Sequence, residues 1–214
     1  MIHLSSKEFN PPTNRLEVLD KSGILNYIQS TIFNANNRNQ NEIREPKRIK
    51  RDNNDDANTG KDVKCKWAYC DLGCNEGDLS LALASAVIDK LNGGDSMHCL
   101  GLDIDEQLIS RAQAKKKSTQ GDNADADARI VNDGLEFQFG AEFEVCNLND
   151  EDEHLEKSRA YLKSIGKERF DLTSIFSTTM WIHIHGGDEA LIAFLKRTCS
   201  LTDYLLVEPQ PSKW

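Results

Sequence analysis

The chain has 214 residues, which is enough for one α/β domain with a buried core and too few for two comfortable ones. Its formal net charge of −9 argues against a broad electrostatic grip on nucleic acid, which normally leaves a basic footprint. The sequence contains no apolar run long enough to cross a membrane and no apolar signal region at its N-terminus. Six cysteines without CxxC or zinc-finger spacing favour a reducing compartment, so we expect a cytoplasmic protein.

The N-terminal part divides into two segments of different character. Apolar residues at Ile24, Leu25, Ile28 and Ile32 predict a short amphipathic helix within residues 1–33. The next segment is so polar that it cannot offset its ordering entropy by burial, and it is predicted to be a disordered insert, residues 34–60. Inside it, the basic run Lys47 to Arg51 is either a nuclear import signal, an RNA tether, or a solvated charge run.

Regular structure is expected from about residue 61 onward. The pattern predicts strands at 67–72, 97–103, 143–148, 170–176 and 204–207. It predicts helices at 79–91, 106–116, 151–165 and 187–199, with a polar loop at 117–135. Strands that alternate with helices predict an α/β fold with a doubly wound, mostly parallel sheet.

The first strand ends in a glycine turn, Asp71-x-Gly73-x-x-x-Gly77. Gly73 permits a tight turn, and Gly77 is expected to let the backbone pass close to a ligand. The spacing is not the dinucleotide GxGxxG pattern, and an ordinary strand-to-helix turn is the alternative. Asp103 ends the second strand and is placed to accept ribose hydroxyls, with Asp105 as the better helix cap. Ribose contacts without a pyrophosphate apparatus favour S-adenosylmethionine.

A second group of polar side chains follows the fourth strand. Trp181, His183 and His185 are expected on an extended chain at the same edge of the sheet. The histidines could donate to a phosphate, and Trp181 could stack on a base. Trp181 could also be plain core. No Cys, Asp or Glu cluster with ligand spacing accompanies the histidines, so no metal is expected.

Three stretches in this order resemble the bicoid-interacting-3 family of RNA methyltransferases. They are Asp-Leu-Gly-Cys-Asn-Glu-Gly-Asp-Leu-Ser at 71–80, Thr-Met-Trp-Ile-His at 179–183 and Tyr-Leu-Leu-Val-Glu-Pro-Gln-Pro at 204–211. The resemblance implies a Rossmann-like, S-adenosylmethionine-dependent methyltransferase fold over residues 61–214, without the C-terminal strands usual in the family. It also implies that residues 1–33 cover the cofactor and substrate. The implied reaction is O-methylation of a phosphate at the 5′ end of RNA.

The resemblance also assigns residues by position. It implies that Asn75 contacts the cofactor, Asp103 the ribose, Asn147 and Leu148 the adenine end, and Arg15 the methionine carboxylate. Asp71, Gly73 and Gly77 belong to the same cofactor motif, and Phe176 lines the site. His183 and Trp181 are the implied catalytic residues. Where this chain has His185 the family usually has asparagine, and where it has Asn147 relatives often have aspartate.

The implied substrate is a 5′-monophosphate end, as in histidine tRNA or precursor microRNA, bound by a monomer. Two alternatives remain open. One is methylphosphate capping of a 5′-triphosphate on a small nuclear RNA of the 7SK type. The other is a non-catalytic RNA-binding relic, which the acidic balance and the departures from the family pattern suggest. A small-molecule methyltransferase sharing only the first motif is a weaker third reading.

Overall fold

The computed structural model describes residues 12–33, 66–88, 91, 95–120, 128–132 and 135–209. The predicted insert at 34–60 and its basic run lie outside these residues, so the predicted disorder of the insert and the roles suggested for the basic run remain predictions. Among the described helices, none combines the length and apolarity needed to cross a membrane.

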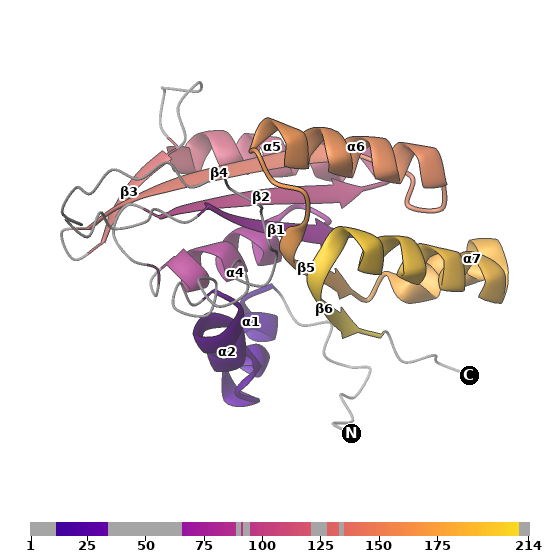
Figure 1. The fold of residues 1–214 in the computed structure, drawn as a ribbon, viewed down its shortest axis with the longest axis horizontal. Helices are drawn as coiled ribbons and strands as arrows, with labels where there is room; N and C mark the ends of the chain where they lie inside the picture. Colours follow the sequence, from indigo (N-terminus) through magenta and orange to yellow (C-terminus); the bar gives the residue numbers. More distant parts are fainter. Residues whose placement is uncertain are drawn as a thin grey trace, which may run out of the picture.

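A six-stranded sheet forms the centre of the molecule, in the order β3-β4-β2-β1-β5-β6 (Figure 1). Only β3 runs antiparallel, against β4, and the other neighbouring strands are parallel. The strands are β1 Lys66–Leu72, β2 Ser96–Asp103, β3 Ala128–Asn132, β4 Leu135–Val145, β5 Phe170–Phe176 and β6 Thr202–Glu208. The predicted mostly parallel sheet is confirmed.

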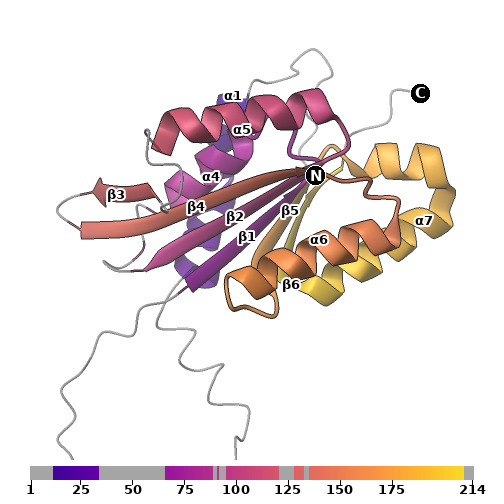
Figure 2. The same ribbon diagram turned by 90° about the horizontal axis from the view of Figure 1, so that it is seen from above.

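Helices cover both faces of this sheet, as Figure 2 shows with α5 on one side and α6 and α7 on the other. The helical elements are α1 Pro12–Lys21, α2 Ile24–Tyr27, the π-helical turn η1 Ile28–Ile32, α4 Asp78–Ile88, α5 Glu106–Gln120, α6 Glu151–Ser164 and α7 Thr179–Leu201. The N-terminal helices, α4 and α5 share one apolar cluster, and α6 and α7 share another. The doubly wound arrangement is therefore confirmed.

Alternation along β1 explains why two cores form. Trp67 and Tyr69 belong to the cluster under α4, whereas Ala68 and Cys70 belong to the cluster under α6 and α7. The N-terminal helices contribute to the first cluster, and the ring of Phe33 meets that of Trp67 edge-on at 5.4 Å. These helices are thus part of the domain core.

Two sequence-based expectations about this fold were wrong. The polar loop expected at 117–135 contains the end of α5 and strand β3, and β4 begins at Leu135, well before the strand expected at 143–148. β3 and β4 pair antiparallel, and each has apolar residues within an otherwise polar stretch of sequence. The segment expected to be extended at 180–188 is instead helical and belongs to α7, with a break in the helix at Gly187 (φ 70°, ψ −170°).

Candidate active site

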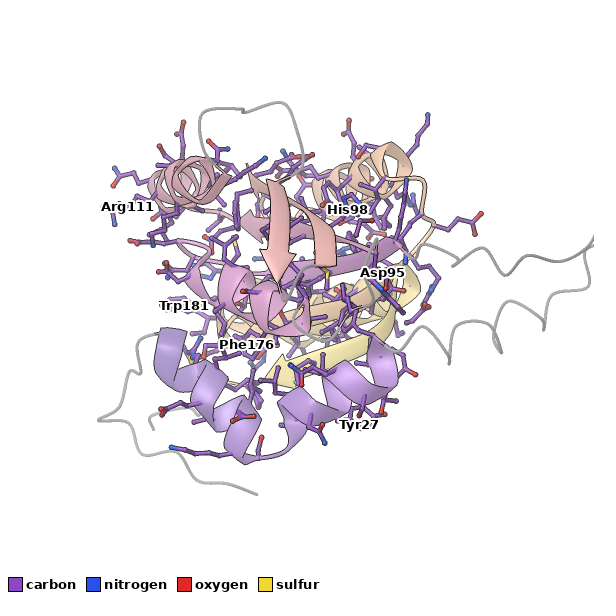
Figure 3. The ribbon with its side chains drawn as sticks, turned by 90° about the vertical axis from the view of Figure 1, so that its left-hand side faces the viewer. Tyr27, Asp95, His98, Arg111, Phe176 and Trp181 are labelled. Atoms are coloured by element: carbon purple, nitrogen blue, oxygen red, sulfur yellow. The ribbon has the colours of Figure 1, made fainter. Side chains whose placement is uncertain are left out.

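A cavity of about 720 Å³ opens at the carboxyl ends of the central strands, where ligands bind in open α/β sheets. Phe176 and Trp181, both labelled in Figure 3, contribute to its wall from β5 and α7. Eight of the residues predicted from sequence line it: Arg15, Gly73, Asn75, Asp103, Asn147, Leu148, Phe176 and Trp181. Three do not, namely Asp71, Gly77 and His183.

The two glycines of the first turn have different roles. Gly73 has φ +81° and lines the cavity, and a Cβ there would overlap the side chain of Thr178. Gly77 has φ +75°, and a Cβ there would lie 2.7 Å from the ring of Phe143 on β4. A close approach at Gly77 is therefore made to the protein's own core, and Gly77 is not among the residues that line the cavity.

Backbone hydrogen bonds hold the carboxylate of Asp103 in the cavity wall. One of its oxygens accepts from the backbone N–H of Asn75 at 2.9 Å, and the other accepts from that of Asp105 at 3.0 Å. Asn75 adopts φ +54°, a left-handed conformation that asparagine tolerates. Asp105 accepts from the N–H groups of Gln107 and Leu108, which confirms it as the cap of α5.

Asp71 lies beneath the cavity, with 2% of its surface exposed. Its carboxylate accepts hydrogen bonds from Ser80 at 2.5 Å and from Ser174 at 2.7 Å. Burial raises the pKa of this carboxyl above its usual value, and the two hydroxyl bonds oppose that rise. Asp71 therefore joins β1 to α4 and β5 and supports the turn that carries Gly73.

The loop after β4 forms the far wall with Asn147, Leu148 and Asn149. The backbone carbonyl of Leu148 accepts a 2.8 Å hydrogen bond from Arg197 of α7, and Arg197 also donates to His154 Nδ1 at 3.1 Å. Burial and the nearby Arg197 lower the pKa of His154 to about 4. The histidine is thus a neutral acceptor at physiological pH, and the three groups tie the loop to α7.

Arg15 reaches the cavity from α1. Its guanidinium donates to the Ser177 hydroxyl at 2.9 Å and lies 3.9 Å from the Glu208 carboxylate. Ser177 follows β5 with φ +58°, and its N–H donates to the Glu208 carbonyl. The cation is therefore positioned by the ends of β5 and β6 and faces the same cavity as Asp103.

The first turns of α7 form the remaining wall. Trp181 lines the cavity yet is 55% exposed, and its ring lies 6.3 Å from that of His185, centroid to centroid. His185 lines the cavity as well. His183 turns away and forms a 2.6 Å contact with Asp188. Since successive helical residues rotate by about 100°, two residues two positions apart face nearly opposite sides.

Two models of known protein families match this chain. Residues 64–191, more than half of the chain, match the family model described as a methyltransferase domain. The chain belongs to the methyltransferase domain family. Residues 170–214 match the family described as Bicoid-interacting protein 3, which confirms the resemblance found in the sequence.

Several curated proteins are similar in sequence to this methyltransferase domain. The chain is 32% identical over 148 residues to the pre-miRNA 5′-monophosphate methyltransferase of Danio rerio, covering 67% of this chain and 51% of that protein. It is 33% identical over 149 residues to the RNA 5′-monophosphate methyltransferase of Rattus norvegicus, covering 67% of this chain and 46% of that protein. The chain thus spans about half the length of the curated relatives it matches.

Among solved structures, monomeric WbdD is similar at a TM-score of 0.42 and 22% identity, covering 69% of this chain and 27% of that chain.

The sequence left several wall residues of the methyltransferase domain unassigned. They are Ile104, Asp105, Leu108, Asn149, Ser177, Thr178 and Ile182. Most of them lie within a few residues of Asp103, Leu148 or Phe176, which were predicted from the sequence. This proximity to a predicted site residue is the signal that could have identified them. In the part of the chain that the structure describes, no group of three His, Cys, Asp or Glu side chains could hold a metal ion.

Proposed function

We propose that this methyltransferase domain transfers a methyl group from S-adenosylmethionine to the 5′-monophosphate of RNA. One observation carries the proposal. A single cavity is lined by Asp103 and Arg15 at one end and by the exposed pair of Trp181 and His185 on α7 at the other. The names of the relatives, RNA 5′-monophosphate methyltransferases, support the choice of acceptor.

The donor groups of the cavity fit the cofactor. Asp103 uses two of its roughly four lone-pair sites on backbone N–H groups, which leaves capacity for ribose hydroxyls. Arg15 would pair with the methionine carboxylate, in a charge-assisted contact. Ile104, Leu108 and Leu148 supply apolar surface for the adenine. When bound, S-adenosylmethionine supplies an electrophilic methyl group on a sulfonium.

The chain's own residues have a limited task in the methyl transfer. A phosphate monoester is already anionic at neutral pH, because its second pKa is about 6, so no general base is required. The protein must orient the phosphate oxygen and exclude wrong geometries, which lowers the entropic part of the barrier. Trp181 offers a stacking surface for the first base, since its indole is exposed at the edge of the cavity.

The experiment that tests this proposal is methyl transfer from radiolabelled S-adenosylmethionine to one RNA with a 5′-monophosphate, a 5′-triphosphate or a 5′-hydroxyl. We expect transfer to the monophosphate alone. Transfer to the triphosphate alone would indicate a capping enzyme instead. Cofactor binding without transfer to any of the three would indicate a non-catalytic relative.

Calorimetry on the cofactor tests the pocket separately. Replacing Asp103 with alanine should abolish measurable S-adenosylmethionine binding, because the ribose loses its acceptor and the turn at Asn75 loses its anchor. Asp152→Ala, at an exposed position of α6, is the matched control and should bind as the wild type does. Equal affinities in the two variants would refute the pocket assignment.

The proposed setting is a cytoplasmic monomer. The cysteine spacing of the sequence supports the compartment. The identity of the RNA, whether histidine tRNA or precursor microRNA, is part of the same proposal and would follow from the activity of the purified protein on each.

A further inference from the structure

The charge of the cavity wall limits what kind of acceptor it can hold. Of its sixteen lining residues, Arg15 is cationic, Asp103 and Asp105 are anionic, and His185 is the one further titratable residue. With a neutral histidine the lining carries a formal charge of −1. Such a lining by itself repels a highly charged phosphate group. The sulfonium of the bound cofactor would offset part of this charge, and a cation of the protein at the acceptor end would offset more.

Three of these four side chains are already engaged at the cofactor end. Arg15 bonds to Ser177 beside Glu208, and the proposed function assigns it to the methionine carboxylate. Asp103 accepts from two backbone N–H groups, and Asp105 caps α5. The fourth, His185, faces the cavity from α7, where the acceptor would enter beside Trp181.

The hydrogen bond of His185 fixes which ring nitrogen is available. Nδ1 lies 2.8 Å from the carbonyl oxygen of Trp181, one turn earlier on α7. A carbonyl oxygen can only accept, so Nδ1 carries a proton and Nε2 is the nitrogen left for a ligand. Within the described residues, Nε2 has no protein partner. A dianionic phosphate can only accept as well, so the contact requires the doubly protonated ring.

On the basis of the proposed function, we propose that Nε2 of His185 donates to the 5′-phosphate and is the residue that selects a monophosphate end. The imidazolium neutralises one charge of the phosphate while the indole of Trp181 stacks on the base next to it. One donor on one oxygen leaves another oxygen free to face the methyl group. A triphosphate would bring about two further charges to a wall in which the described lining residues include no further cation.

His183 cannot share this role in the observed helix. Its Nε2 is held by Asp188 on the exposed side of α7, and it is not part of the cavity wall. The helical register therefore transfers the phosphate contact to His185, the position where the resembling family usually has asparagine. An asparagine has no positive charge, so this chain would hold its acceptor in a different way.

The test compares RNA binding with and without a terminal phosphate. Fluorescence anisotropy gives the dissociation constants of one short RNA carrying a 5′-hydroxyl, a 5′-monophosphate or a 5′-triphosphate, for the full chain and its variants. In the wild type we expect the monophosphate to bind about tenfold more tightly than the hydroxyl, as is typical of one charge-assisted hydrogen bond. His185→Ala should reduce this ratio to about one, with unchanged affinity for S-adenosylmethionine.

Two further variants make the result specific. His185→Arg should keep the preference for a phosphate and improve relative binding of the triphosphate, because arginine restores and extends the donor set. Lys196→Ala removes an exposed charge from α7 outside the cavity and should leave the ratio at the wild-type value.

The outcomes separate the two proposals. A wild type that binds monophosphate and hydroxyl RNA equally, or a His185→Ala variant that keeps the ratio, would overturn the role of His185. Loss of the ratio in His183→Ala but not in His185→Ala would overturn it as well. A wild type with the expected ratio but no methyl transfer would leave the phosphate site standing and refute the proposed enzyme activity.

Discussion

The two ends of the cavity are built in different ways. At the strand ends, Gly73, Asn75 and Asp103 are held by backbone hydrogen bonds and by contacts that leave no room for another side chain. On α7, Trp181 and His185 stand at the exposed edge, linked to each other by one hydrogen bond. The difference supports the proposed function, in which a closely held site takes a small cofactor and an open site takes a large acceptor that must bind and leave. Changes at the first end should therefore cost folding stability, whereas changes at the second should cost binding alone.

The largest effect on stability is expected from Gly73→Ala. A left-handed alanine costs about 1–2 kcal/mol, and overlap with Thr178 adds about 1–3 kcal/mol. Urea unfolding followed by circular dichroism measures the change. Gly166→Ala is the control, because Gly166 also has positive φ but a Cβ there would meet nothing within 4 Å. It should lose only the cost of the left-handed alanine, about 1–2 kcal/mol. Equal losses in the two variants would show that the Thr178 contact is unimportant.

Arg197→Met should have the next largest effect, about 2–4 kcal/mol of unfolding free energy, because it leaves the Leu148 carbonyl and His154 without their donor. The loop that carries Asn147 should also loosen, so we expect a higher dissociation constant for S-adenosylmethionine in calorimetry. Arg159→Met at an exposed position of α6 serves as the control, with a stability change within about 0.5 kcal/mol. Unaltered cofactor affinity in Arg197→Met would show that the loop keeps its position without the contact to α7.

Acidification should produce a smaller loss through His154. Its pKa is about 4 in the fold, against 6.5 for an unperturbed histidine, so the unfolded chain binds more protons between these values. The stabilisation is fully present above pH 6.5 and falls as the pH approaches 4. From pH 7.5 to 5 the loss is about 2 kcal/mol. Urea titrations of wild type and His154→Gln across this range should differ in slope, and parallel curves would contradict the assignment.

Trp181→Ala should have the smallest effect on stability, within about 0.5 kcal/mol, because the side chain is 55% exposed. RNA affinity is expected to fall about fivefold or more, since base stacking on an aromatic ring contributes about 1–3 kcal/mol. Ile184→Ala, 58% exposed on the same helix but absent from the cavity wall, is the matched control. If both variants bind RNA as the wild type does, α7 is not the acceptor side.

The strand-end part of the site could be predicted from sequence because its geometry is local. Apolar runs locate the strands, and parallel strands bring their carboxyl ends to one edge, so Gly73, Asn75 and Asp103 had to lie close together. The role of Gly77 could not be read locally. The group that it accommodates is the ring of Phe143, which is 66 positions later in the chain.

The α7 part was harder to predict because two periodicities compete there. The alternation of Trp181, His183 and His185 favours an extended chain. The structure instead forms a helix, which buries Ile182 in the apolar cluster shared by α6 and α7. The first part of β4, before the strand expected at 143–148, was missed because of the composition around it. Leu135, Phe137 and Phe139 alternate with polar residues, a strand signal that the polar composition of the neighbouring segment obscured.

The buried guanidinium of Arg197 has a consequence for how variants of this protein combine. Arg197, on the part of α7 after the break at Gly187, donates to the Leu148 carbonyl, so the loop after β4 and the helix that carries Trp181 and His185 before that break are joined by a direct contact. Substitutions in the two walls should therefore be non-additive, with coupling energies that independent sites would not have. A substitution of α7 that displaces Arg197 would also displace the loop that lines the opposite wall of the cavity.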